Sequence, residues 1–584
     1  MEPEPRKSST RRLTIVAQDP SVTINNRILT TQVEVPAEFL ARGPCGSRVH
    51  VIDYDSSTGT LYEPFAYPVN PEGALEDPFS RPNKRTVMTN PGFHAQNVYA
   101  IVMRTLGRFE YALGRRVSWG IPGHQLKVAP HAFADANAFY SREDECLAFG
   151  YFPGEKDMVF TCLSHDVIAH ETCHALIDGL RHHFMTPSSP DQAAFHEGFS
   201  DIVALLSVFA LRDVVHALLD RPTGAEAGLA QSPEGLIKRS SVTMEALKHS
   251  VLLGLAEQMG QELSAVRGRA LRQSALLSPA GSYMKDPAYM EPHRRGEILV
   301  AAMLNAFIRV LSERLRGLGS VSENYLNRGR VAEEAADCAA YLLTMSIRAL
   351  DYVPPVHLDF RDFLSALLTA DHEIRPDDSR YQYRDSLRQS FDRFGIAPGA
   401  ASYAGVPTPD GLWNRFDDTG FNYDCVHFED LGRDRDEMFR FVWEHRERLA
   451  LAPDAYTEIV SLRRCHRIAP DDGFPLRETV AECRQRVQLT AAELQPLYGI
   501  EKPPDMPASL QLTLHGGTTL IFDEFGRVKF SISNSILNRE RQADHLRYLW
   551  KYGYFDKGAS LRQRFSRIHL RRSMDLAKDI EEEW

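Results

Sequence analysis

The sequence predicts an α+β protein with a β-rich N-terminal lobe, an all-helical second lobe and a mixed α/β C-terminal region. Residues 11–65 and 126–160 alternate apolar and polar side chains, as strands with one buried face do. Residues 193–397 repeat apolar side chains at helical spacing, and residues 508–535 have the pattern of a β-hairpin. These patterns divide the chain into four expected segments: 1–65, 66–180, 181–397 and 398–584.

The N-terminal lobe is expected to hold one long helix between its strands and a second helix at its end. Residues 92–115 place apolar side chains three and four positions apart, which predicts an amphipathic helix. After the strands of 126–160, the run DVIAHETCHALID at 166–178 is apolar on most sides of a helix. This second helix carries the most informative residues of the chain.

His170, Glu171 and His174 form the pattern His-Glu-x-x-His within that helix. Residues four apart lie on one face of a helix, so the two imidazoles can bind one tetrahedral Zn²⁺. Zinc lowers the pKa of bound water to about 7, and Glu171 lies close enough to accept a proton from that water. Cys173 is expected to pack in the core. The other histidines near this helix are expected to be surface or loop residues: His165, His182, His183 and His196.

A catalytic zinc needs a third protein ligand and one open position. The extended pattern with a third histidine fails, because Leu180 stands at that place. Glu197 opens the next apolar helix and is the expected ligand, while Asp201, one turn later on the same face, would orient a ligating histidine. The alternative is that Glu197 and Asp201 are a helix N-terminal pair that complements the helix dipole.

These segments resemble the gluzincin zinc metallopeptidases, and in particular their thermolysin-like and fungalysin-like catalytic unit, over roughly residues 60–397. Besides the zinc helix, HEGFSD (196–201) is similar to the family's Asn-Glu-x-x-Ser-Asp segment. The resemblance implies a two-lobed fold with the zinc helix as the floor of a cleft, and one Zn²⁺ per chain. The sequence lacks the Gly-x-Met-Glu-Asn string of the group's aminopeptidases, which favours an endopeptidase.

The resemblance also implies substrate-binding residues. ANAFY (136–140) resembles the edge strand on which the family holds an extended peptide, which assigns Asn137 and Ala138 to substrate binding. An ordinary half-buried strand is the alternative. RALRQSALLSP resembles the family's Leu-Arg-Ser segment, so Arg272 would bind a substrate carbonyl, unless it is a solvated helix arginine.

Stabilisation of the oxyanion is assigned by the same resemblance to His293, which precedes a helix opening Gly-Glu. Read without the family, His293 is a helix-entry histidine with no role. Residues 175–196 lack the family's assisting tyrosine, so Tyr283 or Tyr289 would replace it, or His293 would act alone. A family calcium ligand is matched by Asp166, but its partner glutamate is missing, so structural calcium is expected to be absent or reduced.

The second half of the chain continues with helices and then changes character. A linker or surface loop is expected at 397–411, charged helices over 427–499, and a hairpin turning near Phe525 and Gly526. The Arg-rich tail from 538 is either a solvated helix face or a docking surface for a protein partner. A regulatory or substrate protein is expected to dock on residues 400–584, and this last third of the chain would then regulate access to the site or select the substrate. The helices expected in the second lobe span these ranges: 193–220, 240–272, 296–318, 330–349 and 358–370.

Composition limits the setting of the protein. A net charge of −11 argues against a nucleic-acid surface. The first twenty residues contain no apolar stretch of signal-peptide length, and no run of eighteen apolar residues occurs, so a cytoplasmic protein without membrane contact is expected. The eight cysteines contain no Cys-x-x-Cys pair, which indicates reduced thiols.

Together these features predict a zinc-dependent endopeptidase acting on a peptide or protein substrate. His170, His174 and Glu197 would bind zinc, Glu171 would activate water, and His293 would stabilise the oxyanion. Two other functions stay open at this point. A fourth protein ligand such as Cys173 or His196 would make the metal site structural, in a binding or scaffold protein. A narrow pocket instead of an open groove would favour a hydrolase for a non-peptide amide.

Overall fold

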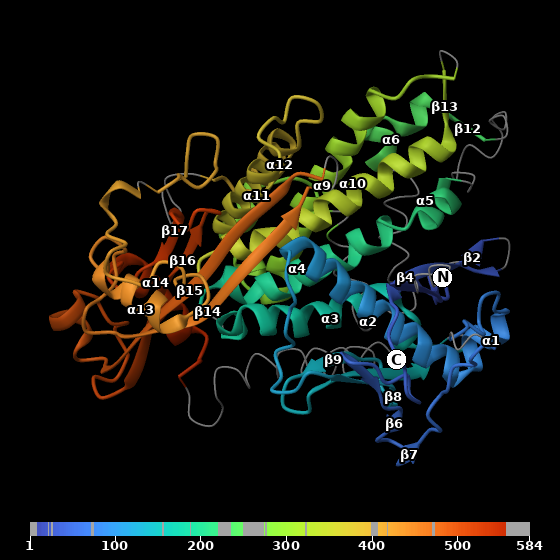
Figure 1. Cartoon of the computed structure of the whole chain (residues 1–584), viewed down its shortest axis with the longest axis horizontal. Helices are drawn as coiled ribbons and strands as arrows, with labels where there is room; N and C mark the ends of the chain where they lie inside the picture. The colour runs from blue at the N-terminus through green and yellow to red at the C-terminus, as the bar shows by residue number, and fades with distance from the viewer. Residues whose placement is uncertain are drawn as a thin grey trace, which may run out of the picture.

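The computed structural model describes residues 9–555 with several gaps, and all statements below concern the described residues. The gaps are residues 22, 25–26, 72–74, 155–156, 187, 220–234, 249–273, 275–276, 322–323, 399–406, 417 and 470–472. The protein has the mixed α+β architecture that the sequence predicts, with strands near both ends and helices between them (Figure 1). Arg272 lies outside the described residues.

The N-terminal strands pack on one long helix. β1 (Thr10–Val16) and β4 (Thr30–Pro36) pair antiparallel and lie against α2 (Pro91–Leu113). α2 begins at Asn90, whose side chain accepts hydrogen bonds from the first backbone amides, and ends at Gly114 in a left-handed conformation. Short elements fill the connections: β2 (Thr23–Ile24), β3 (Arg27–Ile28), β6 (Tyr54–Asp55), β7 (Thr60–Leu61) and α1 (Lys84–Thr89).

The central sheet crosses the predicted boundary at residue 65. Its strand order is β11-β10-β8-β5, with β9 paired to β10. β5 and β8 pair in parallel, so segments 1–65 and 66–180 share one sheet. Of the described strands, only β10 pairs with β9, which makes β9 an edge strand. The strands are β5 (Val49–Val51), β8 (Leu126–Phe133), β9 (Ala138–Ser141), β10 (Cys146–Pro153) and β11 (Met158–Phe160).

Helices form the middle of the molecule, as predicted. α4 packs against α3, α9 and α10, and nearly all of its residues are buried. The helix predicted over 193–220 is two helices, because the chain turns at Ala210 and directs Asp213 to a hydrogen bond from Thr31 on β4. The bounds are α3 (His165–Leu180), α4 (Pro190–Phe209), α5 (Arg212–Leu219), α6 (Met244–Lys248), α9 (Pro292–Arg316), α10 (Arg328–Ala349), α11 (Phe360–Ile374) and α12 (Tyr383–Asp392).

Most of the helix predicted over 240–272 lies outside the described residues. Its described part holds a 3₁₀ turn, Arg239–Val242, and the short α6. Before it, β12 (Leu236–Lys238) pairs with β13 (Tyr325–Asn327).

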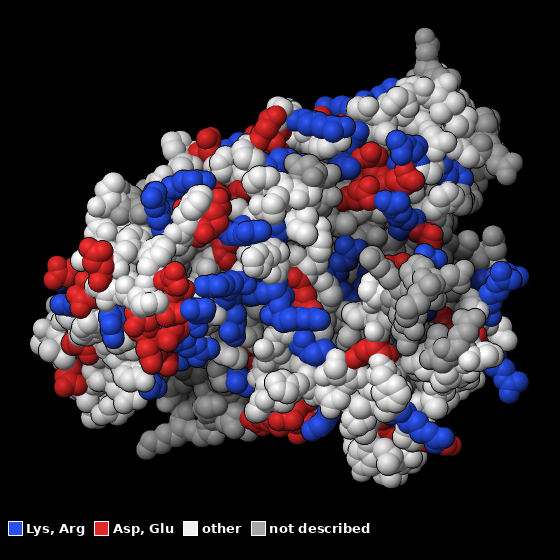
Figure 2. All heavy atoms as spheres, in the orientation of Figure 1, with Lys and Arg blue, Asp and Glu red and all other residues white. Residues whose placement is uncertain are grey.

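The prediction of charged helices over 427–499 is wrong. One helix, α13 (Arg435–Glu444), is followed by two long antiparallel strands, β14 (Tyr456–Ile468) and β15 (Pro475–Thr490). Their alternation is masked in the sequence because polar residues occupy both faces: Arg467, Glu478 and Glu482 point inward and are buried. Figure 2 shows Lys and Arg side chains gathered on the outer surface over these strands.

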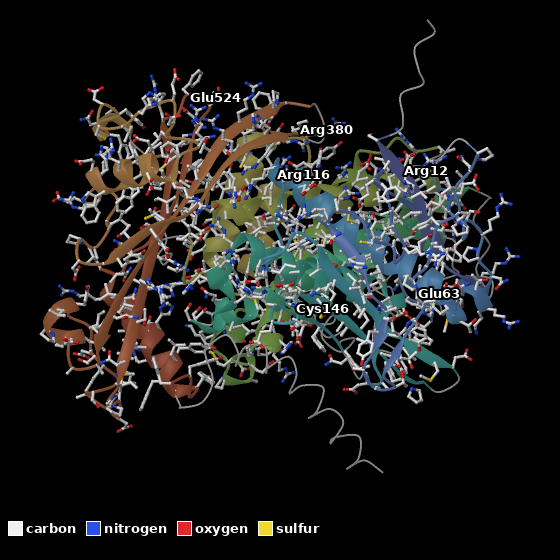
Figure 3. The ribbon with its side chains drawn as sticks, turned by 60° about the horizontal axis from the view of Figure 1, so that its bottom comes forward. Arg12, Glu63, Arg116, Cys146, Arg380 and Glu524 are labelled. Carbon is white, nitrogen blue, oxygen red and sulfur yellow. The ribbon has the colours of Figure 1, made fainter. Side chains whose placement is uncertain are left out.

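The predicted hairpin over 508–535 is confirmed as β16 (Gln511–Phe522) and β17 (Val528–Asn534), and Gly526 has positive φ in the turn. It completes a four-stranded antiparallel sheet of order β14-β15-β16-β17. The expected helix of the tail is α14 (Arg539–Lys551). In Figure 3, Glu524 at the hairpin turn lies on one side of the helices, and Arg12 and Glu63 lie on the other.

The C-terminal sheet shares its core with the helices. Cys465, Val480 and Ile521 belong to the same buried cluster as α3, α4 and α10. Gly114 at the end of α2 approaches β14 so closely that a Cβ there would lie 2.3 Å from the backbone oxygen of His466. Residues 407–555 are therefore part of the main body.

Buried ion pairs also join this sheet to the helices. Arg467 on β14 pairs with Asp351, which follows α10, and with Glu478 on β15. Asp351 also forms an ion pair with Arg115, whose Nη1 atom lies 2.5 Å from Oδ2 of Asp351. Arg467 and Glu478 have no exposed side-chain area, so their charges depend on each other and on the neighbouring groups for stabilisation.

Three buried histidines and the partly buried His515 meet where the C-terminal sheet and α14 contact the helical region. His357 and His545 have ring centroids 3.6 Å apart, and those of His183 and His515 are 4.4 Å apart. Burial lowers the pKa of His515 from 6.5 to about 4. Burial also lowers the pKa of His357 and His545 well below 6.5, and the nearby charge of Arg541 acts in the same direction.

We expect His357, His515 and His545 in this cluster to make the folded protein less stable in mild acid. Below pH 6.5 the unfolded chain binds protons at these histidines while the folded protein does not, so the free energy of unfolding falls as the pH falls from about 6.5 towards 4. The lowered pKa of His515 alone corresponds to a decrease of about 3 kcal/mol in the free energy of unfolding. Urea unfolding with a chelator in every sample, at pH values from 7.5 to 4.5, measures this change.

The matched variants are His515→Phe, which removes a ring whose pKa is lowered in the folded protein, and His124→Phe, which replaces an exposed histidine. In His515→Phe the free energy of unfolding should change less with pH than in the wild type. In His124→Phe it should change with pH as in the wild type. Equal slopes in all three proteins would exclude the cluster as the source.

None of the helices in the described part of the chain combines the length and the hydropathy of a membrane span.

Candidate metal centre

Two packed helices bring the predicted metal ligands together. α3 carries His170 and His174, α4 carries Glu197, and the three side chains are no more than 6% exposed. Glu197 lies well inside α4, whose first turn begins at Pro190. The alternative of a helix N-terminal charge pair is therefore wrong.

The donor atoms of this triad face one another. The Nε2 atoms of His170 and His174 are 2.9 Å apart, and each lies 3.6 Å from an oxygen of Glu197. Tetrahedral zinc with bonds of about 2.0–2.2 Å places its donor atoms about 3.3–3.6 Å apart. The triad therefore fits a zinc ion after a small separation of the two imidazoles, and its three donors leave the fourth position open, as catalytic sites do.

The outer nitrogen of each histidine has its own partner. Nδ1 of His170 lies 2.7 Å from Oδ1 of Asp201, which is the contact expected of an orienting carboxylate. Nδ1 of His174 lies 3.2 Å from Nδ1 of His196 and 3.4 Å from Oγ of Ser200. Asp201 thus fixes the tautomer of His170 that directs an unprotonated Nε2 into the triad.

The expectation of surface or loop positions for the neighbouring histidines is wrong for three of the four. His165, His183 and His196 are buried, and only His182 is substantially exposed. The sequence of one helix shows which side chains share the face of the predicted metal ligands. It does not show that other helices cover the remaining faces and bury their histidines. His196 lies behind His174, on the side away from Nε2, so it is not placed as a fourth ligand.

Glu171 is oriented by the edge strand of the central sheet. The backbone N–H of Tyr140 on β9 donates to Oε2 of Glu171 at 3.0 Å. The Tyr140 hydroxyl donates to Asp178 at 3.0 Å, further along α3. These contacts hold β9 against the zinc helix. Asn137 immediately precedes β9 and Ala138 begins it, and both are buried.

His293, at the start of α9, reaches the triad from a third helix. Its Nε2 lies 3.5 Å from Oε2 of Glu197, and its Nδ1 lies 2.7 Å from Oε1 of Glu291. Glu291 is also the N-cap of α9. Burial alone would raise the pKa of Glu291, but hydrogen bonds and charge from His293 and backbone amides lower it to about 2. Glu291 is therefore an anion that holds the His293 ring in place.

Two glycines allow α4 and α9 to approach closely beside these residues. A Cβ on Gly198 would lie 2.9 Å from the backbone oxygen of Gly296, and a Cβ on Gly296 would lie 3.0 Å from the backbone nitrogen of Gly198. The helices that carry Glu197 and His293 are thus in backbone contact at this crossing.

Tyr283, Tyr289 and Cys173, which the sequence analysis also considered, make their contacts away from the triad. Tyr289 packs its ring against Tyr283, with centroids 4.8 Å apart, and beneath the guanidinium of Arg294. Cys173 is buried in the core as expected.

No protein-family model and no curated protein sequence matches this chain. The assignment of chemistry therefore depends on the geometry of the residues themselves.

The structure also adds participants that the sequence did not indicate. Tyr140 acts through its backbone amide, which any residue except proline would supply, so its side chain gives no sequence signal for this contact. Glu291 stands two residues before His293 and could have been found as the acidic partner of a helix-entry histidine. His196 lies next to Glu197 in sequence but contacts the opposite side of His174.

Proposed function

We propose that this protein is a zinc-dependent endopeptidase with the two-lobed catalytic unit of the thermolysin-like gluzincins. The observation that carries the proposal is the convergence of His170, His174 and Glu197 on one point, with Glu171 beside them and held by the edge strand β9. A metal site alone would not need an oriented carboxylate outside the ligand set. A strand edge beside that carboxylate suits an extended peptide, which could add to β9 near Asn137 and Ala138.

Zinc bound by the triad would supply a Lewis acid for the scissile carbonyl and would lower the pKa of water. Glu171 then accepts the proton of the attacking water and delivers it to the leaving amine. The Tyr140 amide keeps the Glu171 carboxylate in one orientation during both transfers. Asp201 keeps His170 in the ligating tautomer.

His293 is proposed to stabilise the oxyanion. Its Nδ1 atom lies 2.7 Å from Oε1 of Glu291, which holds the ring with Nε2 near the triad. A hydrogen-bond donor at this position would be worth about 10²–10³-fold in kcat, as single oxyanion donors are.

The other two functions considered from the sequence are less well supported. The metal-binding group has three members among the described residues, with neither Cys173 nor His196 in it, so a closed structural site is disfavoured. The position of β9 at the edge of the sheet, beside Glu171, favours a peptide over a small amide.

The test measures zinc content and cleavage of casein by the full-length protein. Wild-type protein should hold zinc and cleave casein, lose cleavage on chelation and recover it when zinc is added. The double variant His170→Ala, His174→Ala should hold one zinc fewer per chain and show no cleavage, whereas His182→Ala should behave as wild type. Unchanged zinc content or persistent cleavage in the double variant would refute the proposal.

A further inference from the structure

A second group of metal-binding side chains lies in the N-terminal lobe. His94 on α2, His131 on β8 and Cys162 in the 3₁₀ turn Thr161–Leu163 are 2%, 4% and 0% exposed. One donor atom from each lies within 4.8 Å of the other two. The proposed peptidase chemistry uses none of these residues.

Each imidazole in this group has its outer nitrogen bound to an acceptor. Nε2 of His94 lies 2.8 Å from the backbone oxygen of Val87, and Nδ1 of His131 lies 2.8 Å from Oδ2 of Asp53. A carbonyl oxygen and a carboxylate oxygen accept hydrogen bonds and do not donate them, so both outer nitrogens carry protons. In neutral rings the two inner nitrogens are then unprotonated.

The two inner nitrogens nevertheless face each other. Nδ1 of His94 and Nε2 of His131 are 2.7 Å apart. Two lone pairs at this distance repel, so a cation must lie between the rings. A shared proton would leave a charged imidazolium in a site lined by Phe160, whose ring centroid is 5.0 Å from that of His94 and 5.4 Å from that of His131. A shared proton would also give no role to the nearby thiol of Cys162.

We propose that His94, His131 and Cys162 bind a second metal ion, and that this ion is Zn²⁺. Two imidazoles and one thiolate are preferred zinc ligands. The charges balance: the thiolate and the Asp53 carboxylate compensate the two positive charges of the ion. A carboxylate and a backbone carbonyl behind the ligating rings are the usual outer partners of metal-bound histidines. Binding separates the two inner nitrogens from 2.7 Å to about 3.3 Å.

The second zinc would stabilise the fold, and because the site has three protein ligands, a water molecule would complete its tetrahedral coordination. It links three segments that are distant in the sequence, namely α2, β8 and the turn that leads directly into α3. The zinc helix thereby becomes anchored at its N-terminal end to the central sheet. Because the metal binds the folded arrangement only, it stabilises the N-terminal lobe in proportion to its affinity.

The test uses the full-length double variant His170→Ala, His174→Ala, in which the first site cannot bind. This protein should still contain one zinc per chain. After replacement of zinc by Co²⁺, it should show the intense near-ultraviolet charge-transfer band of a thiolate–cobalt bond. The three ligands of the second site are unaltered in this protein, and its urea unfolding transition, measured beside that of the wild type, shows that it is folded when its zinc is counted.

Adding Cys162→Ala should remove the zinc and the cobalt–thiolate band, whereas Cys338→Ala, at another buried cysteine, should keep both. A metal-free double variant, or a cobalt spectrum without the thiolate band, would overturn the proposal in favour of a shared proton. Neither result depends on peptidase activity, so the two proposals fail separately.

Discussion

Replacing Glu171 with glutamine is expected to lower peptide hydrolysis by about 10²–10⁴-fold while zinc stays bound. Glutamine has the shape of glutamate, and its amide oxygen can still accept the hydrogen bond from the Tyr140 amide. It cannot accept the proton of the attacking water. The measurement is kcat/KM on a fluorogenic peptide, together with zinc content, for wild type and variant.

Glu143→Gln is the matched control, since Glu143 is exposed in the turn between β9 and β10. Its activity should remain within about twofold of wild type, as surface changes away from a site usually have small effects. Wild-type turnover in Glu171→Gln would assign the general base to another residue. Loss of zinc in that variant would instead make Glu171 a ligand.

Replacing Arg467 with methionine is expected to destabilise the protein by about 3–5 kcal/mol, the usual cost of breaking a buried ion pair. Methionine fills part of the space but leaves Glu478 and Asp351 with less compensation. Arg115 still neutralises part of the charge on Asp351. The urea midpoint of unfolding measures the loss.

Arg464→Met, at an exposed position on the same strand, should change the free energy of unfolding by less than about 0.5 kcal/mol. If both variants lose equal stability, the effect belongs to the strand surface and not to the buried pair. A stable Arg467→Met would show that Arg115 and Lys529 suffice to compensate the two carboxylates.

The buried ion pairs between β14, β15 and the helical region also determine which experiments can test the role of the C-terminal region. The sequence alone suggests that removing everything after about residue 400 would test whether this region regulates access to the site. Such a truncation would uncover Asp351, Tyr352 and Arg181, whose partners lie on β14 and β15. Loss of activity would then report loss of folding. Single substitutions on the outer face of the sheet are the cleaner test of a docking role.

The features that could be predicted from the sequence are those whose residues lie close together in the chain. His170, Glu171 and His174 lie within one turn and a half of helix, so their common face is fixed by helix geometry. Glu197 and Asp201 follow on the next helix, and their spacing repeats the argument. The hairpin at 508–535 could be found because its residues alternate and a glycine marks the turn.

Signals that depend on distant parts of the chain could not be found in this way. His94, His131 and Cys162 come from three separate elements, and no spacing rule joins them. The prediction of helices over β14 and β15 is wrong because their inward-facing Arg467 and Glu478 find partners only in the folded protein. The predicted surface or loop position of His196 is wrong because other helices, distant in the sequence, bury it.

The glycine contact between α4 and α9 limits which substitutions the protein can accept beside the candidate metal centre. Since Gly198 and Gly296 meet backbone to backbone, no larger side chain can be introduced at either position without driving the two helices apart. Substitution of either glycine would therefore change the distance between Glu197 and His293. Variants designed to test the proposed substrate site should therefore keep both glycines and also the β9 backbone that orients Glu171.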